Sequence, residues 1–202
     1  MSDRVTSHFQ IGWRLFKARA GVFVVSMTLL FLSGSVVALL VLHPSGFAIG
    51  LINPLAWLLV YSGMIVGLHV IALKSVNDRV PRIDDLFGSL ALGPTHLLAL
   101  AVYCAAVSLG FALLIVPGIY LGMRYCLVAQ IITDKSAGPL VALRDGAVLA
   151  RAKYTQLGAL FVIAFLLNAA GAAILGLGLV ISFPVSLLAI AGFYHSLQPA
   201  TA

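Results

Sequence analysis

The sequence contains no glutamate, and its acidic residues are six aspartates among 202 residues. Charged residues make up 9% of the chain and hydrophobic residues 62%, whereas a soluble domain of average composition has about 25% charged residues. The polar side chains are therefore too few to cover a soluble globule. The lack of acids also removes most of the side chains from which enzymes build acid–base pairs.

The few charges gather in three segments, Asp3–Arg19, Lys74–Asp85 and Asp134–Lys153, and Arg124 is the one exception. Three uncharged blocks separate or follow these segments. Each block is too long for a single span of about 20 residues. A helical hairpin satisfies the backbone polar groups inside lipid, so the sequence predicts an all-α membrane bundle of six transmembrane helices arranged as three hairpins.

Because a hairpin returns the chain to its starting side, all three charged segments should share one membrane face. They carry eleven of the twelve Lys and Arg residues, and the opposite loops carry none. This asymmetry predicts a multi-pass protein of the bacterial cytoplasmic (inner) membrane with both termini in the cytoplasm. It also accounts for the net charge of +6, so no nucleic-acid partner is expected.

A short amphipathic stretch precedes each uncharged block. In the first stretch Phe9, Trp13 and Phe16 follow helical spacing beside basic residues, which predicts anchors at the membrane interface. The second stretch follows Pro81 and the third begins at Pro139. The alternative is that these stretches pack on one another as cytoplasmic connectors.

One unit of amphipathic helix and hairpin is used three times within a single membrane domain, over 5–73, 81–133 and 139–198. Prolines mark the second half of each unit, at Pro54, Pro117 and Pro184. The units predict a bundle with approximate three-fold symmetry. The alternative is a chance similarity between apolar segments of low complexity.

Pairs of small residues four positions apart predict close helix contacts. These pairs are Gly63–Gly67, Gly118–Gly122 and Ala172–Gly176. Packing inside one chain is the favoured interpretation, and a homo-oligomer interface is the alternative.

Arg124 stands alone in an apolar run. Counted back from Asp134 at 1.5 Å per residue, it lies about 15 Å deep in the membrane. One interpretation is that its side chain extends toward the non-cytoplasmic side or bonds free carbonyls near Pro54 or Pro184. The other is that it faces a groove and contacts an anionic group, above all a lipid phosphate.

Four stretches carry a resemblance to a known family. They are "DLFGSLALGP" (85–94), "VPGIYL" (116–121) followed by Arg124, "GPLVALRDG" (138–146) and "PVSLLAIAGFYHSL" (184–197). The chain resembles a bacterial group of six-span membrane proteins that includes the membrane domain of some glycerophosphodiester phosphodiesterases. The resemblance implies six helices but no activity, because the chemistry of the fused members belongs to a separate soluble domain.

No catalytic, cofactor-binding or metal-ligating residue is predicted, and no cofactor. The HExxH and GxSxG patterns are missing, and five histidines are scattered, most near predicted membrane boundaries. We therefore expect a non-catalytic protein that is a scaffold, binds a protein partner on the cytoplasmic face, or interacts with anionic membrane lipids. The alternative is a carrier for a lipid or amphipathic solute, and a membrane enzyme is the least favoured interpretation.

Overall fold

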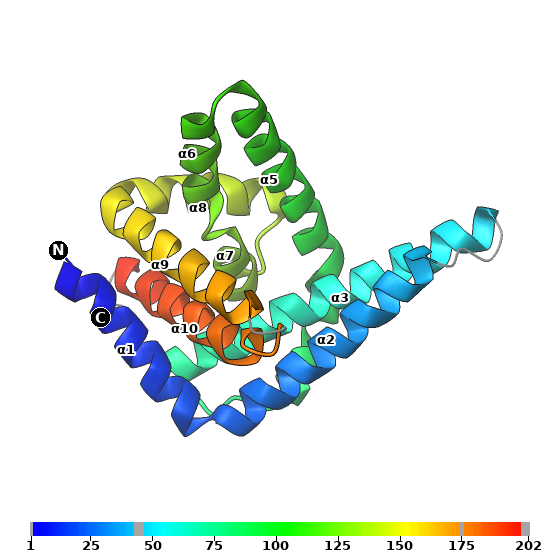
Figure 1. Cartoon of the computed structure of the whole chain (residues 1–202), viewed down its shortest axis with the longest axis horizontal. Helices are drawn as coiled ribbons and strands as arrows, with labels where there is room; N and C mark the ends of the chain where they lie inside the picture. Colours follow the sequence, from blue (N-terminus) through cyan, green and yellow to red (C-terminus); the bar gives the residue numbers. More distant parts are fainter. Residues whose placement is uncertain (1, 43–46, 174–175, 199–202) are drawn as a thin grey trace.

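A computed structural model describes residues 2–42, 47–173 and 176–198. Every regular element in these ranges is a helix, which confirms the prediction of an all-α chain (Figure 1). The elements are α1 (Ser2–Ala18), α2 (Ala20–Leu42), α3 (Phe47–Val76), α4 (Asp84–Gly88), the 3-10 helix η1 (Leu90–Leu92), α5 (Gly93–Leu113), α6 (Ile115–Tyr125), α7 (Val128–Lys135), α8 (Pro139–Ala152), α9 (Tyr154–Ala173) and α10 (Leu179–Leu197).

The long helices have the length and composition of membrane spans. α1 and α2 are bent by 90° at their junction, and together they make a sixth candidate span. The prediction of a multi-pass helical bundle with about six spans is confirmed. The other five spans are Pro54–Val76, Asp84–Leu113, Val116–Lys135, Tyr154–Ala173 and Leu179–Leu197.

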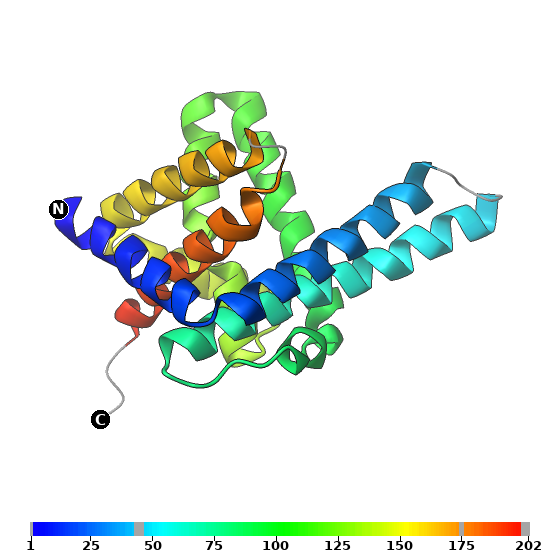
Figure 2. The ribbon, with the colours of Figure 1, turned by 60° about the horizontal axis from the view of Figure 1, so that its bottom comes forward.

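The spans form three hairpins, each preceded by a short helix. In Figures 1 and 2, α2 and α3 run side by side, and the end of α2 and the start of α3 extend away from the remaining helices. α5 and α6 form a second hairpin that points in another direction. α9 and α10 form the third. α1, the pair α4 and η1, and α8 precede the three hairpins in turn. The three-fold symmetry of the units stays a prediction.

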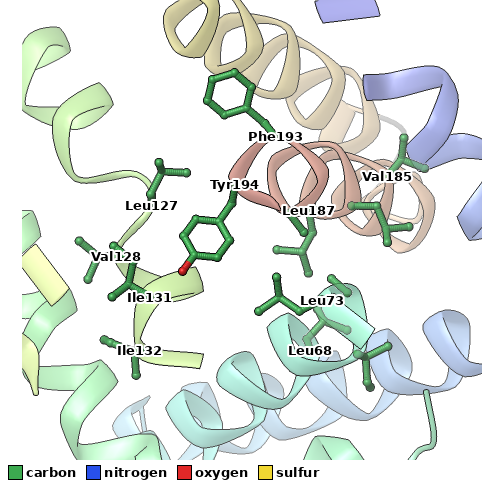
Figure 3. Packing of buried hydrophobic residues seen from close by; sticks show 14 of the residues in the cluster. Leu68, Leu73, Leu127, Val128, Ile131, Ile132, Val185, Leu187, Phe193 and Tyr194 are labelled. Carbon is green, nitrogen blue, oxygen red and sulfur yellow. The ribbon is translucent and has the colours of Figure 1, made fainter. Parts of the chain in front are cut away.

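α10 lies at the centre of the core. In the most apolar part of the α10 span, 56% of the residues are buried inside the protein. The corresponding share is 17% for the span that contains α5 and 22% for α9. α5 and α9 therefore carry the exposed apolar surface expected of helices that face lipid. Figure 3 shows core side chains from three helices: Leu68 and Leu73 of α3; Val128, Ile131 and Ile132 of α7; and Val185, Leu187, Phe193 and Tyr194 of α10.

One contact joins the first two charged segments, and two others join the third segment to the C-terminal end of α10. The side chain of Arg19 donates a hydrogen bond to the backbone oxygen of Arg79, which joins the first segment to the second. In the third segment Asp134 accepts hydrogen bonds from Tyr194 at 2.9 Å and from Gln198 at 2.7 Å. Arg19 and Arg79, and Asp134 and Gln198, are thus pairs of residues far apart in the sequence that meet in the fold.

α1 packs against α10 rather than presenting all three of its aromatic residues outward. A Cβ atom at Gly12 would lie 3.0 Å from the backbone oxygen of Val185, so the two helices cross closely there. Phe16 is buried in the core, Phe9 is half-buried against it, and Trp13 is 44% exposed. The prediction that Phe16 anchors the helix in the interface is wrong, because protein contacts already cover its ring. Trp13 is the residue of the three that is free to meet lipid.

Gly63 and Gly67 lie where α3 meets the short helices α4 and η1. A Cβ atom would lie 2.8 Å from the Cα of Leu90 at Gly63, and 2.2 Å from the backbone oxygen of Leu86 at Gly67. Both distances are too short for any side chain larger than hydrogen. The pair therefore takes part in packing inside this chain.

The second small-residue pair lies in α6, and its two members differ. A Cβ atom at Gly118 would lie 2.4 Å from the ring of Phe111, which packs across the α5–α6 hairpin. A Cβ atom at Gly122 would meet only the hydroxyl of Tyr103, at 3.8 Å. Gly118 is thus required for the close packing of the hairpin, and Gly122 is not.

The third pair, Ala172–Gly176, is not a helix-packing pair. α9 ends at Ala173, and Gly176 has φ of +75° in the turn that follows. Its N–H donates a 2.9 Å hydrogen bond to the backbone oxygen of Ala172, and left-handed backbone of this kind favours glycine. The close contact lies at Gly171 and Gly178, where a Cβ atom on Gly178 would lie 2.6 Å from the oxygen of Gly171.

Candidate anion-binding site

Arg124 lies in the last turn of α6, against two tyrosines of the same helix. Its guanidinium carbon is 6.0 Å from the ring centre of Tyr120 and 5.7 Å from that of Tyr125. Its Nη1 atom donates a long hydrogen bond of 3.5 Å to the hydroxyl of Tyr120. A cation over an aromatic ring contributes about 0.5–1 kcal/mol at an exposed site, so the two rings favour one position of the guanidinium.

A pocket of about 180 Å³ lies between Arg124 and α8. α8 contributes two more arginines to it, Arg144 and Arg151. These residues are two helical turns apart and so lie on the same face of α8. No acidic side chain is among the described residues that line this pocket. We call Arg124, Arg144 and Arg151 the arginine site.

The acids of the third charged segment are engaged elsewhere. The Asp145 carboxylate lies 3.8 Å from the amine of Lys135, and Asp134 accepts the hydrogen bonds from α10 described above. Within the described residues, neither of the two ion pairs involves a member of the arginine site. The three guanidinium groups therefore share the pocket without a protein counter-charge.

Arg124 is isolated from other cations along the sequence but not in space, and its depth in the membrane stays a prediction. The structure brings it together with Arg144 and Arg151 from the basic segment that follows its span. Its Nε atom is buried and has no hydrogen-bond partner. No hydrogen bond joins Arg124 to a carbonyl near Pro54 or Pro184 in the described part of the chain, so the site leaves an unused donor.

Such an arrangement is suited to an anion. Like charges that line one pocket repel one another. An anion in the pocket would replace this repulsion with attraction. The planar guanidinium fork matches the oxygens of phosphate and carboxylate groups, and the arginine site offers three such forks.

Arg124 stands out in the sequence, but no sequence pattern links it to Arg144 and Arg151. Both of these arginines lie off the apolar stripe of α8, in which Leu143 and Ala147 are buried. Their helical spacing predicts one shared face, but it does not predict that α6 packs against that face. Arg144 and Arg151 lie 20 or more positions after Arg124 in the sequence, so local spacing does not predict that they line the same pocket.

Comparison with known proteins does not identify the arginine site. No family model, no curated protein and no solved structure matches the chain. The resemblance to the membrane domain of glycerophosphodiester phosphodiesterases stays a prediction.

Proposed function

We propose that the protein is a non-catalytic integral membrane protein that binds an anionic lipid headgroup at the arginine site. The observation that carries this proposal is the meeting of Arg124, Arg144 and Arg151 around one pocket that has no acidic lining residue. A lipid phosphate supplies the missing counter-charge and accepts hydrogen bonds from guanidinium donors.

The surroundings of the pocket favour a lipid over a soluble anion. Val148 lines the pocket beside the arginines and is 63% exposed, and Leu140 on the same helix is 75% exposed. A short helix with exposed apolar and basic residues suits the membrane interface. A headgroup bound by the arginines would have its acyl chains next to these exposed aliphatic side chains.

The proposal includes a bacterial inner-membrane location with both termini in the cytoplasm. The contact of Arg19 with Arg79 supports one common face for the first two charged segments, and the contact of Asp134 with Gln198 puts the third segment on the side of the C-terminal end of α10. Positively charged residues are retained on the cytoplasmic side. A protein partner on that face and a homo-oligomer stay predictions.

The test uses the whole protein in nanodiscs of phosphatidylcholine, with and without phosphatidylglycerol. An anionic lipid that saturates the site should raise the midpoint of thermal unfolding by about 5–10 °C, from the linkage between binding and stability. Arg124→Leu should abolish this increase while the protein still inserts and folds. Arg124→Lys, which keeps the charge but loses the fork, should show part of it.

Arg14→Leu is the matched control, because Arg14 is exposed on α1 and does not line the pocket. It should keep the full increase. Inorganic phosphate added to phosphatidylcholine nanodiscs separates the two sources of the anion, and it should stabilise the protein much less than phosphatidylglycerol. A full increase in the Arg124→Leu protein would contradict the proposal.

A further inference from the structure

A second cavity, of about 340 Å³, lies between α3, α7, α9 and α10 and is open to the surface of the bundle. Its polar lining residues come from all four helices: His69, Gln130, Asn168 and Ser186. Aromatic and aliphatic side chains supply most of the remaining wall. A mostly apolar cavity with a few converging polar groups is the usual form of a small-molecule site.

Gln130 carries a polar atom that the protein leaves unused. The residue is 2% exposed, and its Oε1 atom is buried without a hydrogen-bond partner. A buried acceptor that has lost water without gaining a donor destabilises the fold. Gln130 is among the residues that line the cavity, so a ligand bound there lies next to the side chain that lacks a donor.

His69 presents a second acceptor to the same cavity. Its Nδ1 atom lies 2.8 Å from the backbone oxygen of Ile65, one turn earlier in α3. A carbonyl oxygen only accepts, so Nδ1 carries the hydrogen, and Nε2 of the neutral ring is an acceptor. It is 8% exposed, and its ring lies 6.4 Å from that of His96.

Asn168, which lines the cavity, forms its hydrogen bonds with other groups of the protein. Its Nδ2 group donates to the backbone oxygen of Ala164 at 2.8 Å and to the hydroxyl of Ser186 at 3.0 Å. Its Oδ1 atom accepts a 3.1 Å hydrogen bond from Ser182. These bonds fix α9 to α10 and use both polar atoms of Asn168, whereas no bond to Gln130 Oε1 or to His69 Nε2 occurs among the described contacts.

We infer that this cavity binds an apolar molecule that ends in a hydroxyl group, with the hydroxyl hydrogen donated to Gln130 or His69. Two acceptors in one cavity select a ligand with a hydrogen-bond donor. A charged ammonium donor fits less well, because no carboxylate lies among the described residues of the lining and burying an unpaired charge is costly. An alcohol provides the donor without the charge.

The cavity has an apolar entrance and room for a chain. Phe165 lines it and is 65% exposed on α9, one of the helices with the largest apolar exposure. A neighbouring cavity of about 190 Å³ shares Cys126, Phe161 and Ile190 with it. An alcohol can therefore enter from the lipid side and extend its chain along this second space.

The cavity is separate from the arginine site, because none of the three arginines lines it. The two sites can thus be tested independently. The probe is tritiated 1-dodecanol with the whole protein in phosphatidylcholine nanodiscs, and empty nanodiscs correct for partition into lipid. Saturable binding is expected, and dodecyl methyl ether, which lacks the donor, should compete at least about tenfold less well.

Gln130→Leu keeps the approximate size of the side chain and removes the acceptor. It should weaken dodecanol binding about tenfold and reduce the difference between the alcohol and the ether. Gln156→Leu is the matched control on α9, outside both cavities, and should bind dodecanol as the native protein does. Arg124→Leu should do the same, so a failure of the anion site would not be mistaken for a failure here.

Equal affinity for alcohol and ether, or unchanged binding by Gln130→Leu, would overturn the inference. If Gln130→Leu does not fold, the native glutamine can be kept and Cys126 used as a reporter. In a Cys104→Ala protein, 1-dodecanol should slow alkylation of Cys126 by N-ethylmaleimide several-fold. The ether at the same concentration should not, and equal protection by both compounds, or by neither, would also overturn the inference.

Discussion

The hydroxyl of Tyr154, the first residue of α9, donates a hydrogen bond of 2.7 Å to the backbone oxygen of Tyr120 in α6. The two rings lie 5.3 Å apart. This contact joins the third hairpin to the second, one helical turn before Arg124. The ring of Tyr120 also contacts the guanidinium of Arg124, so the hydrogen bond helps to position the arginine site.

Replacing Tyr154 by phenylalanine keeps the ring and removes this hydrogen bond. We expect Tyr154→Phe to destabilise the protein by about 1 kcal/mol, which lowers the midpoint of thermal unfolding by about 2–4 °C for a chain of this size. It should also reduce the stabilisation by phosphatidylglycerol. Tyr61→Phe is the control, since no hydrogen bond of the Tyr61 hydroxyl occurs among the described contacts, and a loss of equal size there would contradict the assigned role.

Gly67 and Gly122 offer a direct comparison of two predicted packing glycines. A methyl group at Gly67 would overlap the backbone of Leu86, and overpacking of this kind costs about 1–3 kcal/mol or more. Gly122→Ala meets only ordinary contact and should leave stability within about 1 kcal/mol of native, helped by the helix propensity of alanine. Thermal unfolding in one detergent measures both variants, and similar midpoints would argue against the α3–α4 contact.

The helical architecture was predictable from the sequence because charge is so unevenly distributed. Each uncharged run is too long for one span and therefore forms a pair of spans. The short helices lie at the amphipathic stretches between charged residues. The start of α8 at Pro139 agrees with the preference of proline for the first helical turn. These features depend on local composition, which a single sequence records directly.

The arginine site and the second cavity were not predictable, because both depend on how separate helices meet. Arg124 looks isolated in the sequence, and only the packing of α8 on α6 brings Arg151 to it. Gln130 and His69 are single polar residues in apolar runs, with no spacing that links them. Gly176 was mistaken for a packing residue because a pair of small residues does not reveal that the helix has ended.

The orientation of the hairpins gives a prediction for labelling in cells. Single cysteines at Ser136, after α7, and at Leu114, between α5 and α6, should lie on opposite sides of the membrane in a background without Cys104 and Cys126. An impermeant maleimide applied to intact spheroplasts should label Leu114→Cys and leave Ser136→Cys unlabelled until the cells are opened. Both positions are exposed in the structure, so poor access does not explain a missing signal. Labelling of both from outside would contradict the cytoplasmic placement of the charged segments.

The packing of α1 separates the roles of Trp13 and Phe16, whose rings stack 5.9 Å apart. Phe16 is 5% exposed and also lies 6.0 Å from the ring of Phe23 at the start of α2. Phe16→Ser removes a large buried side chain, for which truncation costs about 3–5 kcal/mol. It should release α1 from α10 and make the segment before Ala20 sensitive to limited proteolysis in membranes.

Trp13→Ser removes an exposed ring that lies under the amine of Lys17, and the packed face of the helix stays intact. Trp13→Ser should therefore remain as protease-resistant as the native protein. If Trp13→Ser releases α1 and Phe16→Ser does not, lipid rather than α10 holds this helix.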